Sequence, residues 1–356
     1  MDLSSLFQRR EQLISLDIGA SSVKLVELEL SGSGVKLLNI GSMPIEGEVF
    51  TSNVISKKDK VADAISALLE AHGVDDKRVI TCVPGPTVFT KKIKTPQVPY
   101  PELVANVNME AANFIPHNID AVRLDFHILK EVGKNQFELL VVAVKNEVID
   151  AVVETLSLAG LEAAIIDVDY FALQNIFEHS YPEYLSSTVA LVDFGARYSS
   201  VNIVQGGSSL FTGDVSAGGR TVVEALQESL ELTRGDAEAL VQSGGGDGDS
   251  QSALQAEVET LAKEFNRQLS FFWSAAGADQ GIDRIMLSGG AAQTSGFISA
   301  LEEITGLPCE QLDPYRNIDT DGGFDDKLLK QLAPSVGVAF GMALREPGDR
   351  ILPEDL

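Results

Sequence analysis

The chain has 356 residues, which is enough for two hydrophobic cores, because single cores stop growing at about 250 to 300 residues. Its formal net charge of −25 excludes wholesale binding to nucleic acid or to an anionic bilayer, since both require a positive field. The two cysteines and the lack of any apolar run near the roughly 20 residues of a spanning helix are typical of a cytosolic protein, and partners should be neutral, apolar or basic.

A β-hairpin with an acidic tip is predicted near the start of the chain. Residues 13–16 and 23–30 have strand-like patterns, and the turn between them is Asp17-Ile18-Gly19-Ala20-Ser21-Ser22. Glycine lets the backbone approach a phosphate, successive N–H groups form an anion nest, and serine hydroxyls add donors. The aspartate suits a water of hydrated Mg²⁺, an ion that keeps several waters. One such hairpin alone is more often an ordinary turn.

The next elements predict a compact block inserted into the first half of the chain. A strand at 35–40, a helix at 61–71 and a buried strand at 79–83 come first. Residues 87–160 then have the order strand, helix, two strands and helix, with strands at 88–94, 122–129 and 137–144 and helices at 101–114 and 146–159. This order is self-contained, so we expect the block to fold as a unit.

A second acidic hairpin is predicted about half a chain later. It follows a strand at 163–168 and a helix at 171–178, and its sequence is Val192-Asp193-Phe194-Gly195-Ala196-Arg197-Tyr198-Ser199-Ser200. Two Asp-x-Gly turns with a later Gly-Gly strand end are a much stronger indication of a phosphate ligand than one turn.

The remaining elements are mostly helical. Helices at 221–232, 236–242 and 254–272 precede a strand at 282–287, the pair Gly289-Gly290 and a helix at 297–304. The Gly- and Asp-rich segment at 243–250 lacks the Lys-Ser/Thr of a phosphate-binding loop, which favours a surface loop. Gly337 and Gly341 lie one turn apart on the last helix, where small residues allow another helix to cross closely.

In order, the three glycine turns resemble the phosphate-1, phosphate-2 and adenosine motifs of the actin-like ATPase superfamily. This resemblance implies an α/β, ribonuclease H-like fold of two lobes around a cleft for ATP and Mg²⁺. Further segments resemble the FtsA-related PilM family of type IV pilus proteins, and these are Asn108-Met109-Glu110-Ala111-Ala112-Asn113-Phe114-Ile115-Pro116, Asp167-Val168-Asp169-Tyr170-Phe171-Ala172-Leu173-Gln174-Asn175, Ala217-Gly218-Gly219-Arg220 and Val336-Gly337-Val338-Ala339-Phe340-Gly341-Met342-Ala343-Leu344-Arg345. The match extends from about residue 13 to residue 345.

The resemblance implies a division into subdomains, in which 1C is the insertion shared by FtsA and PilM. The expected boundaries are 12–86, 161–187 and 334–346 for 1A, 87–160 for 1C, 188–222 and 282–333 for 2A, and 223–281 for 2B. The helix at 171–178 and the last helix would cross at the hinge between the lobes.

The resemblance also implies a role for each motif residue. Those expected at the terminal phosphates are Gly19, Ser21, Ser22 and Lys24. The residues expected to hold the waters of Mg²⁺ are Asp17 and Asp193. The opposing hairpin would be formed by Gly195, Ala196, Ser199 and Ser200, whose hydroxyls would serve the nucleotide. The residues expected near the ribose or phosphates are Gly218, Gly219 and Arg220, and those expected beside the adenine are Gly289, Gly290 and Ala291.

One departure from the family pattern affects recognition of the base. PilM-like sequences often have Ala-Glu-x-x-Lys in a second-lobe helix, where Glu and Lys reach the ribose and base. Here Glu238 is present and Val241 replaces the lysine, which weakens the expected recognition of adenine.

Hydrolysis of ATP would also need a residue that orients the attacking water. Asp167 and Asp169 are the candidates, because one face of the preceding strand could present both to the cleft; they could equally be hinge or capping carboxylates.

The resemblance implies a cytoplasmic scaffold that reaches the inner membrane only through a partner. The expected partner is the cytoplasmic tail of a PilN-type inner-membrane protein, held as a short extended peptide between 1A and 1C. Pilus motor ATPases are further candidates, and turnover of ATP is not required.

Three alternatives stay open. Sugar and acetate kinases of the superfamily have larger inserted substrate domains than this block. FtsA proteins usually end in an amphipathic membrane helix, whereas residues 348–356 are short and acidic. A PilM-like module of a secretion or pseudopilus system is the third alternative.

Overall fold

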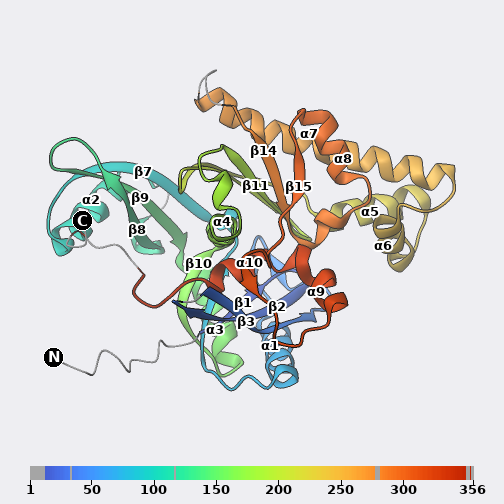
Figure 1. Cartoon of the computed structure of the whole chain (residues 1–356), viewed down its shortest axis with the longest axis horizontal. Helices are drawn as coiled ribbons and strands as arrows, with labels where there is room; N and C mark the ends of the chain where they lie inside the picture. The colour runs from blue at the N-terminus through green and yellow to red at the C-terminus, as the bar shows by residue number, and fades with distance from the viewer. Residues whose placement is uncertain (1–12, 33, 116–117, 277–280, 350–352, 354–356) are drawn as a thin grey trace.

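The structure, a computed structural model, describes residues 13–32, 34–115, 118–276, 281–349 and 353, so most of the acidic segment at 348–356 lies outside the described residues. The described residues form two lobes, each built on a β-sheet, and a smaller sheet beside the first lobe (Figure 1). This mixed α/β arrangement agrees with the fold class predicted from the sequence. No helix in the described ranges is long and apolar enough to cross a bilayer.

The first lobe contains a six-stranded sheet in the order β10-β6-β1-β2-β3-β16. Its strands are β1 (Ile14–Ile18), β2 (Ser22–Ser31), β3 (Gly34–Pro44), β6 (Arg78–Val83), β10 (Glu162–Val168) and β16 (Ile318–Asp319). Side chains alternate between the two faces, so Ile14 and Leu16 join the core under helices α1 (Lys58–His72) and α3 (Asn146–Leu158). Ser15 points the other way and donates to the Ala339 carbonyl at 2.7 Å.

A small hairpin between β3 and α1 is not predicted from the sequence. It consists of β4 (Phe50–Thr51) and β5 (Val54–Ile55), and each strand contributes one buried apolar side chain to the first-lobe core. Ser52 and Asn53 form its turn with left-handed φ angles of 49° and 64°. Two non-glycine residues in this region cost energy, so the turn needs contacts that hold it.

The inserted block forms a separate antiparallel sheet in the order β7-β9-β8. Its strands are β7 (Val88–Pro96), β8 (Val122–Glu131) and β9 (Gln136–Lys145), and helix α2 (Tyr100–Ala111) covers one face with Leu103 and Val107. The sequence predicts a self-contained block over 87–160, whereas α3 packs in the core of the first lobe. The sheet and α2 are therefore the part that stands apart, on the left of Figure 1.

The second lobe contains a five-stranded sheet in the order β13-β12-β11-β14-β15. Its strands are β11 (Val189–Phe194), β12 (Ser199–Gln205), β13 (Ser208–Val215), β14 (Arg284–Ser288) and β15 (Cys309–Gln311). Its helices are α5 (Gly219–Leu230), α6 (Arg234–Ser243), α7 (Gly248–Ala276) and α8 (Phe297–Thr305). The sequence does not predict β13, because Ser, Gly and Asp interrupt its apolar pattern.

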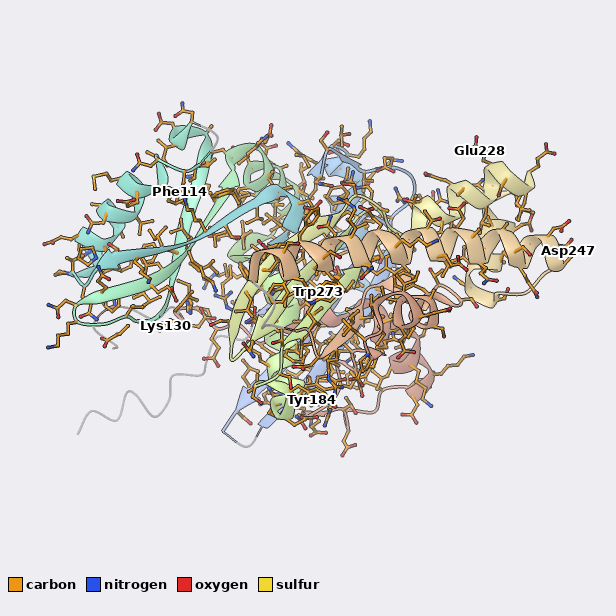
Figure 2. All side chains as sticks on the ribbon, turned by 90° about the horizontal axis from the view of Figure 1, so that it is seen from above. Phe114, Lys130, Tyr184, Glu228, Asp247 and Trp273 are labelled. Carbon is orange, nitrogen blue, oxygen red and sulfur yellow. The ribbon has the colours of Figure 1, made fainter. Side chains whose placement is uncertain are left out.

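Helix α7 supplies one face of the second-lobe core. The apolar residues that recur along it are buried, namely Leu254, Val258, Leu261, Phe265, Leu269 and Phe272. Seen from above, the helix runs from Asp247 at one end to Trp273 near the middle of the molecule, while Phe114 and Lys130 lie on the inserted block at the far side (Figure 2). Because α7 starts at Gly248, the loop expected at 243–250 is shorter than predicted.

Two helices cross between the lobes. A Cβ atom at Gly341 of α10 (Gly337–Ala343) would lie 1.7 Å from the Ala172 carbonyl oxygen of α4 (Asp169–Ser180), so only glycine permits this contact. The close crossing predicted from the two glycines is confirmed, whereas a hinge function there stays a prediction. The short helix α9 (Asp326–Leu332) packs beside this core, and β16 extends the first-lobe sheet although the predicted boundaries assign it to 2A.

Candidate functional site

A cleft between the lobes brings most of the predicted site residues together. Its volume is ≈ 380 Å³, within the range of small-molecule sites. It lies at the carboxyl ends of four strands, where Asp17, Cys82 and Asp193 are the next-to-last residues of β1, β6 and β11 and Gly289 follows β14. Parallel strands open a crevice at this edge, which explains why turns far apart in sequence meet here.

The first turn combines an ion pair with a ring of small residues. Asp17 and Lys24 are opposite each other in the β1–β2 ladder, and Lys24 Nζ lies 3.0 Å from Asp17 Oδ2. Burial alone would lower the pKa of Lys24, but the Asp17 carboxylate outweighs burial and the pKa is raised. The lysine therefore stays charged. Gly19, Ser21 and Ser22 line the cleft beside it.

The second turn holds an acid without a counter-ion. Asp193 is opposite Ser200 in the β11–β12 ladder, and within the described ranges no ion pair involves this carboxylate. Burial, followed by repulsion from Asp169 and Asp17, raises the pKa of Asp193 to about 7. The turn also brings Gly195, Ala196, Arg197 and Tyr198 to the cleft.

Three predicted residues of this region do not line the cleft. Ser199 and Ser200 lie within β12 and are buried; Ser199 Oγ donates to the Ala217 carbonyl at 2.8 Å, and Ser200 Oγ has no partner in the described part of the chain. Gly218 packs against the turn, where a Cβ atom would lie 2.5 Å from the Ala196 carbonyl carbon. Both serines belong to the β11–β12 hairpin as predicted, but the turn that lines the cleft ends at Tyr198, before either hydroxyl, and a role for them in nucleotide binding stays a prediction.

Asp167 and Asp169 lie on different sides of the first lobe. Asp169 lines the cleft and is 3% exposed, whereas Asp167 pairs with Arg345 and lines another cavity. The expectation that one strand face presents both to the cleft is wrong, since Asp169 is already the first residue of α4.

Asp169 forms a lobe-to-lobe contact at the floor of the cleft. Its Oδ2 accepts from the Gly85 N–H at 3.0 Å and from the Tyr198 hydroxyl at 2.8 Å, and its Oδ1 accepts from the Tyr170 N–H at 2.6 Å. Burial raises its pKa to about 6. With both oxygens engaged, the carboxylate ties α4 to the second turn. A role in orienting water stays a prediction.

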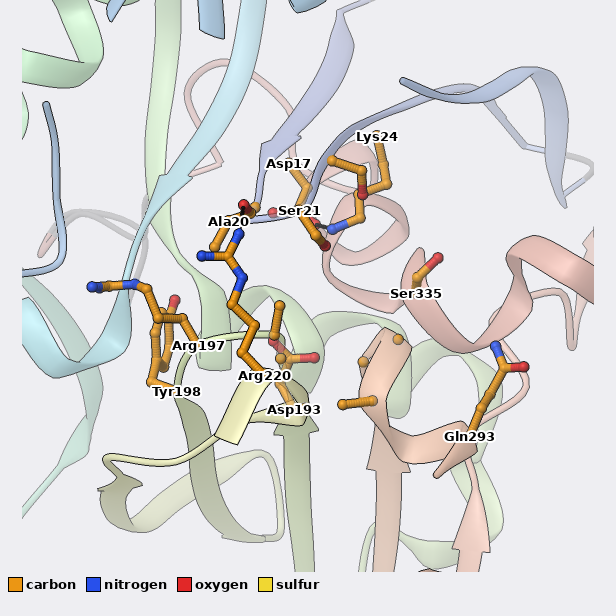
Figure 3. A pocket seen from close by; sticks show the side chains of 18 of the residues that line it. Asp17, Ala20, Ser21, Lys24, Asp193, Arg197, Tyr198, Arg220, Gln293 and Ser335 are labelled. Atoms are coloured by element: carbon orange, nitrogen blue, oxygen red, sulfur yellow. Dashed lines mark hydrogen bonds and ion pairs between the residues drawn. The ribbon is translucent and has the colours of Figure 1, made fainter. Parts of the chain in front are cut away.

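The far end of the cleft is less charged. Gly289, Gly290 and Ala291 line it with Gln293 and Ser335, at the opposite side of Figure 3 from Arg197. A Cβ atom at Gly289 would lie 2.2 Å from the Phe194 carbonyl oxygen, so this glycine lets β14 and β11 approach closely. The turn therefore has a packing role beside any contact with a base.

Helix α6 contributes an ion pair to the lining of the cleft. Glu238 accepts from Arg234 Nε at 2.8 Å, and Val241 is buried one turn further on. Sequence reasoning finds Glu238 and misses Arg234, although the spacing of four residues on a helix could have indicated the pair. Arg234 supplies a cation to the cleft from the helix where Val241 replaces the lysine of the family pattern.

Two arginines of the second lobe reach across the cleft. Arg220 Nη2 donates to the Ala20 carbonyl at 2.7 Å and its guanidinium pairs with Glu48. Arg197 donates to Asn53 Oδ1 and lies 5.5 Å from the centre of the Phe50 ring. Figure 3 shows Arg220 directed from the start of α5 toward Ala20. Sequence reasoning names Arg220 and misses Arg197.

The residues of the cleft fit a nucleotide with Mg²⁺. Asp17 and Asp193 supply hard carboxylate oxygens, and within the described residues no group of three or more acidic, His or Cys side chains could enclose a metal directly. Two carboxylates suit Mg²⁺, an ion that keeps most of its waters. Lys24, Arg220 and the backbone of the first turn offer cations and N–H donors for phosphates.

A second cavity, here called the groove, lies between the inserted sheet and the first lobe. Its volume is ≈ 1090 Å³, and it is lined by β8, β9, β10, α4 and the segment from Leu344 to Asp349. Strand β10 is the edge of the six-stranded sheet, and Leu140 and Val142 of β9 supply apolar floor. Asp167 and Arg345 form an ion pair on its wall.

Two lobes with matching hairpins around an interlobe cleft define the actin-like ATPase fold. Two solved structures share this fold at low identity. Ethanolamine utilization protein EutJ from Carboxydothermus hydrogenoformans has a TM-score of 0.58 and 13% identity, over 94% of this chain and 89% of that one. MreB5 of Spiroplasma citri bound to ADP has a TM-score of 0.51 and 11% identity, over 93% and 94%.

The family is shown by two further comparisons. The family model described as type IV pilus assembly protein PilM matches residues 15–347, and the chain belongs to this family. A chain of the PilM–PilN type IV pilus biogenesis complex has a TM-score of 0.84 and 27% identity, over 95% of this chain and 99% of that one. The resemblance predicted from the sequence is confirmed.

Proposed function

We propose that this protein is a nucleotide-binding scaffold of type IV pilus assembly, which takes Mg-ATP in the cleft and the cytoplasmic tail of a PilN-type inner-membrane protein in the groove. The observation that carries the proposal is the position of α4. Its first residue, Asp169, lines the cleft, and Phe171, Gln174 and Glu178 line the groove. One helix therefore contacts both ligands.

Nucleotide binding is supported by the converging chemistry of the cleft. Asp17 and Asp193 suit a hydrated Mg²⁺, and Lys24 and Arg220 suit phosphates. The family similarity and the ADP-bound MreB5 neighbour agree with this assignment at the level of the fold. The scaffold needs binding alone, because a ligand that favours one arrangement of the lobes shifts their equilibrium without being hydrolysed.

The groove has the chemistry expected of a site for a basic, partly apolar peptide. Its acidic side chains outnumber its basic ones, the acids being Asp125, Asp167, Glu178 and Asp349 and the bases Arg345 and His127. Cytoplasmic segments next to membrane spans carry an excess of Lys and Arg. An extended tail added along the edge strand β10 would place alternate side chains on the apolar floor.

Coupling between the two ligands follows from the shared helix. Closure of the lobes on Mg-ATP would move Tyr198, and because its hydroxyl is hydrogen-bonded to Asp169, α4 would carry that shift to the groove. Such coupling requires that the peptide bind the two states with different affinity. Membrane association would then be indirect, through the partner.

The test is a titration of a labelled synthetic PilN-type tail from the same organism. We expect Mg-ATP to change the peptide affinity by about fivefold or more, as is usual for coupled sites. Leu140→Asp, on the groove floor, should weaken peptide binding by about tenfold or more through lost apolar contact.

The matched control is Leu158→Asp, the same change at a side chain of α3 that is 57% exposed. It should leave the peptide affinity unchanged. Equal affinity for the wild-type protein and Leu140→Asp would overturn the groove assignment, and equal affinity with and without Mg-ATP would overturn the coupling.

A further inference from the structure

The phosphate end of the cleft is covered by a segment of the first lobe, residues 45–53, here called the roof. Its start is fixed to the first turn, because the Ile45 N–H donates to the Ser21 carbonyl at 2.8 Å. Its end is the β4–β5 turn, whose left-handed Asn53 is held by Arg197. The roof is therefore clamped at one end by its own lobe and at the other by the second lobe.

Arg220 makes the middle contact of the roof, and this contact is an ion pair with a largely exposed partner. Its guanidinium pairs with Glu48, and Nη2 also reaches the Gly47 carbonyl at 3.5 Å. The Glu48 side chain is 57% exposed, whereas that of Arg220 is 15% exposed. An ion pair with one solvated partner contributes little, typically about 0 to 1 kcal/mol, so a stronger anion could displace Glu48.

A second feature indicates that Arg220 is set to receive an anion. Its Nε is buried and has no hydrogen-bond partner among the residues that the structure describes. A buried donor without a partner is costly, and a guanidinium offers a planar fork that matches phosphate oxygens. The same guanidinium donates to the carbonyl of Ala20 inside the first turn, so it already lies beside the proposed phosphate site.

On the basis of the proposed nucleotide site, we propose that Arg220 distinguishes nucleoside triphosphates from diphosphates. The terminal phosphate of a triphosphate would take the guanidinium from Glu48 and Ala20, whereas a diphosphate would not reach it. Because Arg220 belongs to the second lobe, this exchange joins the lobes only when the third phosphate is present. Glu48 acts as a competing anion that keeps affinity for the triphosphate low until it is displaced.

The test is calorimetric titration of Mg-ATP and Mg-ADP into the full chain and four variants. Glu48→Gln removes the competitor, so Mg-ATP should bind about two- to fivefold more tightly, and Mg-ADP should be unchanged. Arg220→Gln should weaken Mg-ATP by roughly tenfold to a hundredfold, and Mg-ADP by less than about threefold.

Two controls are matched in chemistry. Glu46→Gln changes an exposed acid of the same segment that forms no ion pair with Arg220 within the described residues, and should alter neither affinity. Arg234→Gln removes another cation of the cleft lining, one that pairs with Glu238 of its own helix, and should change both affinities by the same factor.

Each outcome bears on the inference. A tighter Mg-ATP complex in Glu48→Gln with an unchanged Mg-ADP complex supports it. Measurable binding of both nucleotides with the same ATP-to-ADP ratio in all five proteins overturns it while leaving the proposed function intact. No binding of either nucleotide to the wild-type protein overturns the proposed nucleotide function together with this inference.

Discussion

The two Asp-x-Gly hairpins have the same strand register, but only one of them places a counter-charge beside its aspartate. In each, the aspartate is paired across the ladder with the residue seven positions later, Asp17 with Lys24 and Asp193 with Ser200. Lys24 places an ammonium 3.0 Å from Asp17, whereas the Ser200 hydroxyl is buried without a partner. The first hairpin thus carries its own counter-charge, and the second leaves its acid with a raised pKa.

The tips of the hairpins differ in the size of their side chains. At the fourth and fifth positions after the aspartate, the first hairpin has Ser21 and Ser22, and the second has Arg197 and Tyr198. Small hydroxyls leave room for a ligand, whereas the two large side chains cross to the first lobe. The same turn therefore takes two forms, one with small side chains that line the cleft and one with large side chains that contact the other lobe.

The largest effect should come from breaking the ion pair of the first hairpin. Lys24→Met leaves Asp17 in the cleft without its counter-charge, and the free energy of unfolding should fall by about 3 kcal/mol. Urea denaturation measures this loss. The double variant Asp17→Asn, Lys24→Met should recover most of it, because no charge is then left alone. A double variant as unstable as the single one would contradict the contrast drawn between the hairpins.

The next effect distinguishes the two turns by what each glycine contacts. A Cβ atom at Gly195 would lie 2.8 Å from the Tyr198 carbonyl, which is backbone, whereas at Gly19 the nearest atom is Lys24 Nζ, also at 2.8 Å. Gly195→Ala should cost about 2 kcal/mol of stability, because backbone cannot yield easily. Gly19→Ala should cost less, since the end of a lysine can move.

Thermal unfolding and nucleotide titration together test this difference. Gly19→Ala should lose Mg-ATP affinity out of proportion to its small loss of stability, because the displaced Lys24 no longer faces the phosphates. If Gly19→Ala were the less stable of the two variants, the first turn would be as rigid as the second and the distinction would fail.

Much of this comparison could be predicted from the sequence. The strands on both sides of each Asp-x-Gly turn are apolar and β-branched, so β1, β2, β11 and β12 are found from their patterns. The position of Ser199 and Ser200 behind the tip has a simple physical cause. The ladder fixes the register from the aspartate, and counting from Asp193 gives Arg197 and Tyr198 at the tip and the two serines in β12.

The rest depends on packing that no local pattern encodes. Arg220 and Glu48 are 172 residues apart and meet only because the lobes face each other. Asp167 and Asp169 are neighbours in sequence, yet the start of α4 turns one toward the cleft and the other toward the groove. Strand β13 is specified by its place beside β12 rather than by its own composition.

A smaller effect is expected from the unpaired acid of the second hairpin. The pKa of Asp193 is raised from 3.8 to about 7 in the folded protein, so protonation of this carboxylate stabilises the folded state at pH values below about 7. Its contribution to stability falls as the pH rises from about 4 to about 7. Between pH 5 and pH 8 this loss lowers the free energy of unfolding of the wild-type protein by on the order of 1 kcal/mol. Asp193→Asn should abolish the loss, as measured by urea titrations at the two pH values.

The same group should control the metal-nucleotide complex. Because Mg²⁺ waters need the ionised carboxylate, wild-type affinity for Mg-ATP should rise from pH 6 to about pH 8, while Asp193→Asn should bind weakly with little pH dependence. Asp17→Asn provides the comparison in the first hairpin, where loss of the charge should destabilise the protein instead. Equal pH profiles for wild type and Asp193→Asn would remove Asp193 from the site.

The smallest effect concerns the two serines that occupy different places in the hairpins. Ser22 lines the cleft, so Ser22→Ala should weaken Mg-ATP binding by up to about tenfold through loss of one hydrogen bond. Ser200→Ala should leave the affinity unchanged, and it should not destabilise the protein, because its buried hydroxyl has no partner to lose. Calorimetry and urea denaturation on both variants measure these differences. A loss of Mg-ATP affinity in Ser200→Ala equal to that in Ser22→Ala would mean that β12 shifts on binding and brings the hydroxyl into the cleft, and the two hairpins would then be chemically alike.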